Sequence, residues 1–183
     1  RDRWLGLELT AHEDHLWQNT MERLTVSALE QPQIFVHRDY HSRNLMVTAS
    51  SAPGVLDFQD AVTGPLTYDL VSLLRDCYIQ WPATRVDDWL NQFRDMLIRE
   101  GIPGCHDAAC LRRWFDLMGC QRHLKAIGIF ARLKIRDQKD RYLDDIPRTL
   151  GYVAHITQEH PELRAFWHFI RNRVYPLLAE QRT

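Results

Sequence analysis

The sequence lacks the features that would place it in a special class of protein. Its 183 residues contain no apolar run of about 18 residues, the length needed for a helix to cross a membrane. Lysine and arginine number 23 against 24 aspartate and glutamate, so the formal net charge of −1 provides no general attraction to nucleic acid or an anionic membrane. The chain has no internal repeat and no low-complexity tract. Its length suits a single domain with its own core.

Cysteine is also scarce. The four cysteines form no C-x-x-C pair, and this number does not make a disulfide scaffold. Cys105, His106 and Cys110 match no zinc-binding spacing. We therefore expect reduced thiols that act as small apolar side chains, in a cytoplasmic protein.

The apolar pattern changes character near residue 70. Helical spacing first covers residues 11–29, and Thr10 with Glu13 forms a capping box at its start. Three short apolar runs follow, bounded by polar, Gly, Pro or Ser residues, and predict strands at 34–37, 45–48 and 54–57. Beyond Pro65 the spacing predicts helices at 68–79, 86–99, 108–136, 146–159 and 162–178. The sequence thus predicts a mainly helical α+β fold.

The loops between the predicted strands carry acidic and amide side chains in a recognisable order. Asp39 follows the first strand, and Asn44 stands five residues later, directly before the second. Asp57 ends the third strand. The His-Arg-Asp triplet, the following Asn and the later Asp-Phe pair match the order of the kinase catalytic loop and metal-binding segment. Each motif alone is more often a turn or strand-end feature, and only their joint order favours kinase chemistry.

Phosphoryl transfer explains why these residue types are needed. The acceptor hydroxyl requires a carboxylate to orient it and take its proton, which is the role we assign to Asp39. Mg²⁺ prefers oxygen ligands, and Asn44 and Asp57 supply an amide oxygen and a carboxylate. Asp60 lies three residues beyond Asp57 and is a weaker candidate for a second metal or the substrate.

Residues 35–45, 55–61 and 64–70 together resemble the aminoglycoside phosphotransferase family of small-molecule kinases. The resemblance implies a kinase-like fold, ATP and Mg²⁺ as cofactors, and a structural role for Asp69 and His37 in supporting the catalytic loop. Within the family, the sequence is similar to bacterial kinases that phosphorylate the anomeric hydroxyl of N-acetylmuramate and N-acetylglucosamine during cell-wall recycling. His41 and Gln59 replace the Lys and Gly that protein kinases have, and no Ala-Pro-Glu segment follows Asp57.

The motifs that cover ATP in kinases are missing from the sequence. It contains no G-x-G-x-x-G loop and no V-A-I-K lysine, which a kinase fold keeps on a separate N-terminal lobe. The chain also starts without Met. We therefore expect residues 1–183 to form one domain, the C-terminal lobe of a kinase-like protein. Its partners would be a sugar, a nucleotide and an N-terminal lobe of the same protein, and the isolated chain would be a poor catalyst.

The charge pattern favours a neutral or anionic acceptor. Between Arg112 and Arg141 nine basic residues stand against three acidic ones, whereas a site for a polycationic aminoglycoside should be acidic. An arginine there would suit the muramate carboxylate. Arg122, His123 and Lys125 are the substrate-binding candidates. Kinases of aminoglycosides, choline or other sugars remain alternatives, as does a non-catalytic kinase-shaped domain that binds a ligand.

Overall fold

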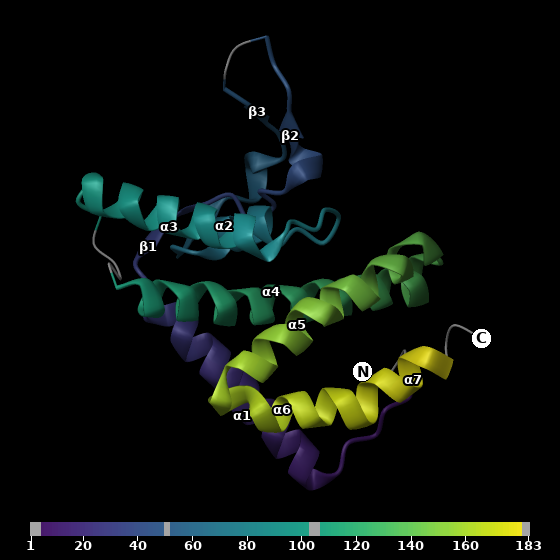
Figure 1. Ribbon diagram of the computed structural model, residues 1–183. Coiled ribbons are helices and arrows are strands. Elements are labelled where there is room, and N and C mark those ends of the chain that lie inside the picture. Colours follow the sequence, from purple (N-terminus) through teal and green to yellow (C-terminus); the bar gives the residue numbers. More distant parts are fainter. Residues whose placement is uncertain (1–4, 50–51, 103–106, 181–183) are drawn as a thin grey trace. The chain divides into compact units, whose positions relative to one another are not determined.

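The computed structural model describes residues 5–49, 52–102 and 107–180, and its contacts divide the chain into two compact units (Figure 1). The loop unit is Val26–Gly119. The helical unit combines Arg1–Thr25 with Cys120–Thr183. Most of the described residues are helical, and the strands form two small antiparallel sheets. The predicted α+β class with a helical majority is confirmed.

The loop unit contains the strands and the three predicted motif residues. It begins in the last turn of α1 (Ala11–Leu29) and ends within α4 (Ala108–Asp137), so both helices contribute to both units. Between them the order is β1 (Gln33–Val36), η1 (Ser42–Asn44), β2 (Leu45–Met46), β3 (Gly54–Val55), η2 (Phe58–Asp60), β4 (Val62–Pro65), α2 (Tyr68–Leu74) and α3 (Ala83–Arg99).

The capping box at the start of α1 is confirmed. The Thr10 backbone N–H donates to Glu13 Oε2 at 2.9 Å, and the Glu13 N–H donates to Thr10 Oγ1 at 3.3 Å. The Thr10 N–H lowers the pKa of the Glu13 carboxyl, outweighing the opposite effect of desolvation, and Arg173 lowers this pKa further. These reciprocal bonds satisfy donors that a helix start leaves open, which is why the helix begins where the sequence indicates.

The strands form two antiparallel pairs, and the motif residues lie in the segments that connect them. β2 pairs with β3, and Figure 1 shows them as the two arms of one hairpin. β1 pairs with β4 in the register Gln33↔Pro65 to Val36↔Val62. β4 was not predicted, because its Gly and Pro are unfavourable in strands. Gly64 is needed there, since a Cβ at this position would lie 3.2 Å from Val36 Cγ2.

The core of the loop unit forms beneath α2. Val71 and Leu74 from α2 pack in one cluster with Leu90 from α3 and Leu111 and Phe115 from α4. Phe115 and Val71 are completely buried. α2 is therefore fixed on its apolar side, while its first turn and its C-terminal end face the segment that contains Asp39.

The helical unit contains the remaining helices. After the C-terminal part of α4 come η3 (Asp140–Asp145), α5 (Ile146–Glu159), η4 (Pro161–Leu163), α6 (Arg164–Phe169), the π-helical turn η5 (Ile170–Val174) and α7 (Tyr175–Glu180). The prediction of one helix over 162–178 was right in extent, and Figure 1 shows α6 and α7 joined in line through η5. No helix in the described ranges is long and apolar enough to cross a membrane.

Two expectations require correction. The helix predicted for 68–79 ends at Leu74, because Arg75 leaves the helical conformation and the side chains of Arg75 and Asp76 turn into the protein, where both are buried. The expectation of reduced thiols was wrong for Cys110, which is disulfide-bonded, whereas Cys77 and Cys120 are not disulfide-bonded. Cys105 and His106 lie outside the described residues.

Two helical glycines provide a direct test of the fold. A Cβ added at Gly128 in α4 or at Gly151 in α5 would meet no described atom within 4 Å beyond its own stretch of helix. Gly128→Ala and Gly151→Ala should therefore each raise the free energy of unfolding by about 0.5–1 kcal/mol. Gly64→Ala should lower it, because the added Cβ meets Val36. Chemical denaturation measures all three variants, and a stabilising Gly64→Ala would contradict the close packing of the Val36 side chain against Gly64.

Candidate active site

The segment after β1 is held by a carboxylate from α2. Asp69 Oδ2 accepts the His37 backbone N–H at 2.6 Å, and Asp69 Oδ1 accepts the Arg38 N–H at 3.0 Å. A carboxylate that accepts two backbone N–H groups makes charge-assisted bonds, which are stronger than neutral ones. Because Arg38 immediately precedes Asp39, these bonds fix the backbone that presents the Asp39 side chain.

Asn44 links the three parts of the motif. Its side-chain Nδ2 donates to the Asp39 carbonyl oxygen at 2.9 Å, and its own carbonyl oxygen accepts the Leu56 N–H at 3.0 Å. Leu56 directly precedes Asp57. Asn44 is therefore hydrogen-bonded both to Asp39 and to the residue before Asp57, although the three motif residues are spread over 19 residues of sequence.

The backbone is strained at two of these positions. Arg38 has φ of 77° and Asp57 has φ of 59°, both in the left-handed region that non-glycine residues seldom adopt. Asp57 stands at the start of η2 in this conformation. Such strain persists only where surrounding bonds impose it, and it is concentrated at functional sites. The bonds from Asp69 and through Asn44 are those that surround these two residues.

The acidic side chains of the motif face solvent. Asp39, Asp57 and Asp60 are exposed, and Asn44 is half-buried. Among the described residues, the carboxylates of Asp39 and Asp57 have no hydrogen-bond or ion-pair partner. Asp60 differs only in that its backbone carbonyl accepts a bond from Arg38, at 3.4 Å. Exposed, unpaired carboxylates leave oxygen atoms available for a ligand.

The donor set suits Mg²⁺ with nucleotide phosphates. No group of three or more His, Cys, Asp or Glu side chains that could hold a metal occurs in the described ranges. Mg²⁺ in phosphate-binding enzymes needs only one or two protein ligands, because phosphates and waters complete its octahedron. The Asn44 Nδ2 donates to the Asp39 carbonyl oxygen, which leaves the Asn44 amide oxygen as an acceptor for a ligand. Asn44 and Asp57 therefore fit this ion.

The His37 side chain packs beneath the loop. Its ring is 4% exposed and makes an edge-on contact with Tyr40, with 5.8 Å between the ring centroids. Neither ring nitrogen has a hydrogen-bond partner in the part of the chain that the structure describes. The expected packing is present, but the hydrogen bond that supports the loop comes from the His37 backbone N–H.

The substrate-binding candidates on α4 differ in exposure. Arg122, His123 and Lys125 lie in the helical unit, whereas the motif residues lie in the loop unit. His123 is 2% exposed and stacks on Tyr152 at 4.8 Å, which favours a packing role. Arg122 is half-buried and Lys125 is exposed.

The basic stretch is less unbalanced in the structure than in the sequence. Several of its cations form ion pairs with carboxylates: Arg112 with Asp87 and Asp116, Arg113 with Glu30, Lys134 with Asp140, and Arg136 with Asp137. Asp87 and Glu30 come from outside the stretch Arg112–Arg141. Local counting along the sequence therefore overstated the positive charge of this region.

Two buried charged residues that follow α2 were not predicted from the sequence. Arg75 is 6% exposed and pairs with Asp116 at 2.6 Å, and Asp76 is 2% exposed and accepts bonds from Ser42. Their one sequence signal is a charged pair placed directly after an apolar helix. Both partners lie more than 30 residues away along the chain, so no local pattern identifies them.

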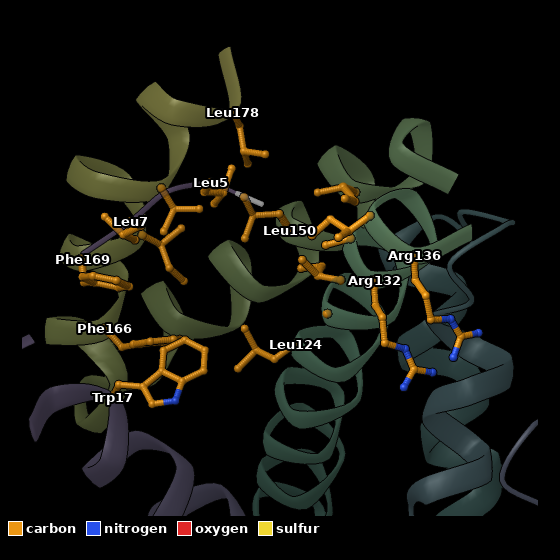
Figure 2. A pocket seen from close by; sticks show the side chains of 17 residues that line it. Leu5, Leu7, Trp17, Leu124, Arg132, Arg136, Leu150, Phe166, Phe169 and Leu178 are labelled. Atoms are coloured by element: carbon orange, nitrogen blue, oxygen red, sulfur yellow. The ribbon is translucent and has the colours of Figure 1, made fainter. Parts of the chain in front are cut away.

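An apolar pocket of about 720 Å³ lies within the helical unit (Figure 2). Leu, Ile and Phe side chains dominate its lining, and Figure 2 shows Trp17 beside Phe166 with Arg132 and Arg136 to one side. An apolar lining does not provide the hydrogen-bonding groups that a sugar requires. We therefore do not assign this pocket to the acceptor.

Hydrogen bonds through Asn44 join Asp39 to Leu56, the residue before Asp57, and the order of these residues matches the kinase catalytic loop and metal-binding segment. The chain belongs to the phosphotransferase enzyme family APH, whose model matches residues 1–106. This match includes all of the motif residues.

Curated relatives extend the similarity over most of the chain. It is 48% identical over 161 residues to the N-acetylmuramate/N-acetylglucosamine kinase of Pseudomonas putida, covering 88% of this chain and 47% of that protein. It is 48% identical over 159 residues to the protein of the same name from Neisseria meningitidis, covering 87% and 47%. A third, from Caulobacter vibrioides, is 30% identical over 141 residues, covering 75% and 37%. The chain spans about half the length of the first two.

Proposed function

We propose that this chain is the C-terminal lobe of an ATP-dependent, cytoplasmic sugar kinase. Its substrate is N-acetylmuramate or N-acetylglucosamine, phosphorylated on the anomeric hydroxyl in peptidoglycan recycling. The observation that carries the proposal is the hydrogen-bonded linkage of Asp39, Asn44 and the Asp57 segment. The names of the relatives at 48% identity support the choice of sugar.

The residues of the loop unit divide the reaction between them. The sugar hydroxyl donates its proton to the Asp39 carboxylate while its oxygen bonds to the γ-phosphorus of ATP, and the bond to the ADP oxygen breaks. Asn44 and Asp57 would hold Mg²⁺, which when bound neutralises phosphate charge. Asp69 fixes the loop through the His37 and Arg38 N–H groups. Asp60, Arg122 and Lys125 remain candidate sugar contacts, and His123 a weaker one.

An N-terminal lobe would complete the nucleotide site. The chain contains neither a glycine-rich phosphate loop nor the strand lysine, and its relatives are about twice as long. Exposed apolar side chains lie close to the motif along the sequence, among them Phe35, Met46 and Phe58. Such side chains suit burial against the nucleotide or a second lobe. This chain together with that lobe constitutes the full-length protein.

A ligand panel tests the proposed function. The full-length protein with Mg²⁺ and a non-hydrolysable ATP analogue is heated with N-acetylmuramate, N-acetylglucosamine, glucose or kanamycin. A sugar at a hundredfold excess over its Kd should stabilise the folded state by about 2.7 kcal/mol, and we expect this for the two N-acetyl sugars. Stabilisation by kanamycin alone would overturn the sugar assignment. If the N-acetyl sugars bind but a parallel assay with ATP in place of the analogue shows no ATP consumption, the protein is instead a non-catalytic ligand-binding domain.

A further inference from the structure

A second carboxylate, which unlike Asp69 is fully buried, holds the other half of the catalytic loop. Asp76 follows α2 and is 2% exposed. Its Oδ2 accepts the Ser42 backbone N–H at 3.0 Å and the Ser42 hydroxyl at 2.6 Å. Its Oδ1 accepts the Tyr78 N–H at 2.8 Å. Three donors thus satisfy a carboxylate whose burial would otherwise be costly.

The Tyr78 ring contacts the same part of the loop. The Arg43 guanidinium lies 3.5 Å from the centroid of the Tyr78 ring, a close cation–π contact. The His41 ring meets Tyr78 edge-on, with 5.4 Å between centroids. The three consecutive residues 41–43 are therefore all in contact with Asp76 or Tyr78.

The bonds that hold residues 41–43 also affect the position of Asn44. The Asn44 N–H donates to the His41 carbonyl at 2.9 Å, which closes the short turn that contains Ser42. The Asn44 side chain donates in turn to the Asp39 carbonyl. A shift of Ser42 would consequently move Asn44, and with it the amide oxygen that remains available to a metal ion.

The two aspartates of the α2 region act on different halves of the loop. Asp69 binds the residues that precede Asp39, and Asp76 binds the residue that lies two positions before Asn44. We propose that Asp76 is a positioning residue, which sets the Asn44 amide for Mg²⁺ through Ser42. The proposal rests on the proposed kinase function.

Asp76→Asn in the full-length protein tests this role. The amide puts an N–H₂ group where one oxygen accepts hydrogen bonds, so a donor from Ser42 or Tyr78 loses its acceptor. Substitution of a residue that hydrogen-bonds to a metal ligand typically lowers metal affinity or activity by about 10- to 100-fold. We expect the Mg²⁺ concentration for half-maximal activity to rise by about tenfold or more, with kcat reduced and the sugar KM little changed.

Two further measurements separate positioning from general stability. In the metal-free protein, amide hydrogen exchange at Ser42 should accelerate in Asp76→Asn, whereas exchange in the α3 helix should not. Ser42→Ala removes only the hydroxyl bond and should shift the Mg²⁺ midpoint in the same direction, by less. Asp88→Asn changes an exposed aspartate of α3 and is the matched control, with no shift expected.

Each outcome decides one part of the inference. If the unsubstituted full-length protein transfers no phosphate, the proposed function fails. If it is active but Asp76→Asn and Ser42→Ala leave both the Mg²⁺ midpoint and Ser42 exchange unchanged, the positioning role of Asp76 is wrong. If Asp76→Asn does not fold, Ser42→Ala tests the positioning role instead, because Ser42 is only half-buried and loss of its hydroxyl leaves the core intact. A fall in Tm with an unchanged Mg²⁺ midpoint would also overturn the inference.

Discussion

Asp39→Asn in the full-length protein should reduce kcat by about 10²- to 10⁴-fold, the usual contribution of a general base. The amide cannot accept the proton of the sugar hydroxyl. Because the Asp39 side chain is exposed and is not bonded to other described residues, the free energy of unfolding should change by less than about 0.5 kcal/mol. Steady-state kinetics with ATP and N-acetylmuramate measures the loss.

The control for Asp39→Asn is another exposed carboxylate of the loop unit, outside the bonded motif. Asp88→Asn on α3 removes the same charge from the loop unit and should leave kcat unchanged within twofold, an allowance of about 0.4 kcal/mol in barrier height. A kcat for Asp39→Asn close to that of the unsubstituted protein would contradict the assignment of Asp39 as the base.

Arg75→Ala should destabilise the loop unit by about 3 kcal/mol or more. Arg75 and Asp116 have side chains that are only 6% and 8% exposed, and removal of one partner leaves a buried charge, which typically costs about 3–5 kcal/mol. The Arg75 guanidinium also lies 4.5 Å from the centroid of the Phe115 ring, and this contact is lost. Arg112 still bonds Asp116 at 3.1 Å, which keeps the expected cost near the lower end.

Chemical denaturation of Arg75→Ala measures this effect. Arg99→Ala is the matched control, because Arg99 pairs with Glu100 on the surface, where the two side chains are 69% and 58% exposed. Surface pairs contribute at most about 1 kcal/mol. Equal destabilisation by the two substitutions would show that the Arg75–Asp116 pair does not stabilise the core.

Two carboxylates hold the Arg112 guanidinium in its charged form. Burial opposes its charge, but the carboxylates of Asp116 and Asp87 outweigh burial and raise its pKa. The cluster links α4 to α3 through Asp87 and to the residue after α2 through Asp116 and Arg75.

Local signals in the sequence predicted much of this structure. The capping box predicted the start of α1, and short apolar runs bounded by polar residues predicted that Asp39 and Asn44 lie between the first two strands. The order of the three motif residues indicated a family of small-molecule kinases, and the chain matches the APH phosphotransferase family over the residues that contain them. Their bonding through Asn44 is a detail that the motif spacing alone does not supply.

Features that depend on contacts distant in sequence were not predicted. β4 contains Gly64 and Pro65, which disfavour a strand, and it forms because it pairs with β1. Asp76 and Arg75 resemble surface charges until their partners, Ser42 and Asp116, are known. The charge of the α4 region was overestimated for the same reason, since Glu30 and Asp87 approach it from other elements.

The most direct test of the account is a crystal structure of the full-length protein with Mn²⁺, a non-hydrolysable ATP analogue and N-acetylmuramate. Anomalous scattering should locate a metal ion bonded to both the Asn44 amide oxygen and the Asp57 carboxylate, at about 2.0–2.2 Å. The anomeric hydroxyl should lie about 2.6–3.2 Å from Asp39. A metal ion bound elsewhere, with Asn44 and Asp57 on separate surfaces, would contradict a shared phosphotransfer site.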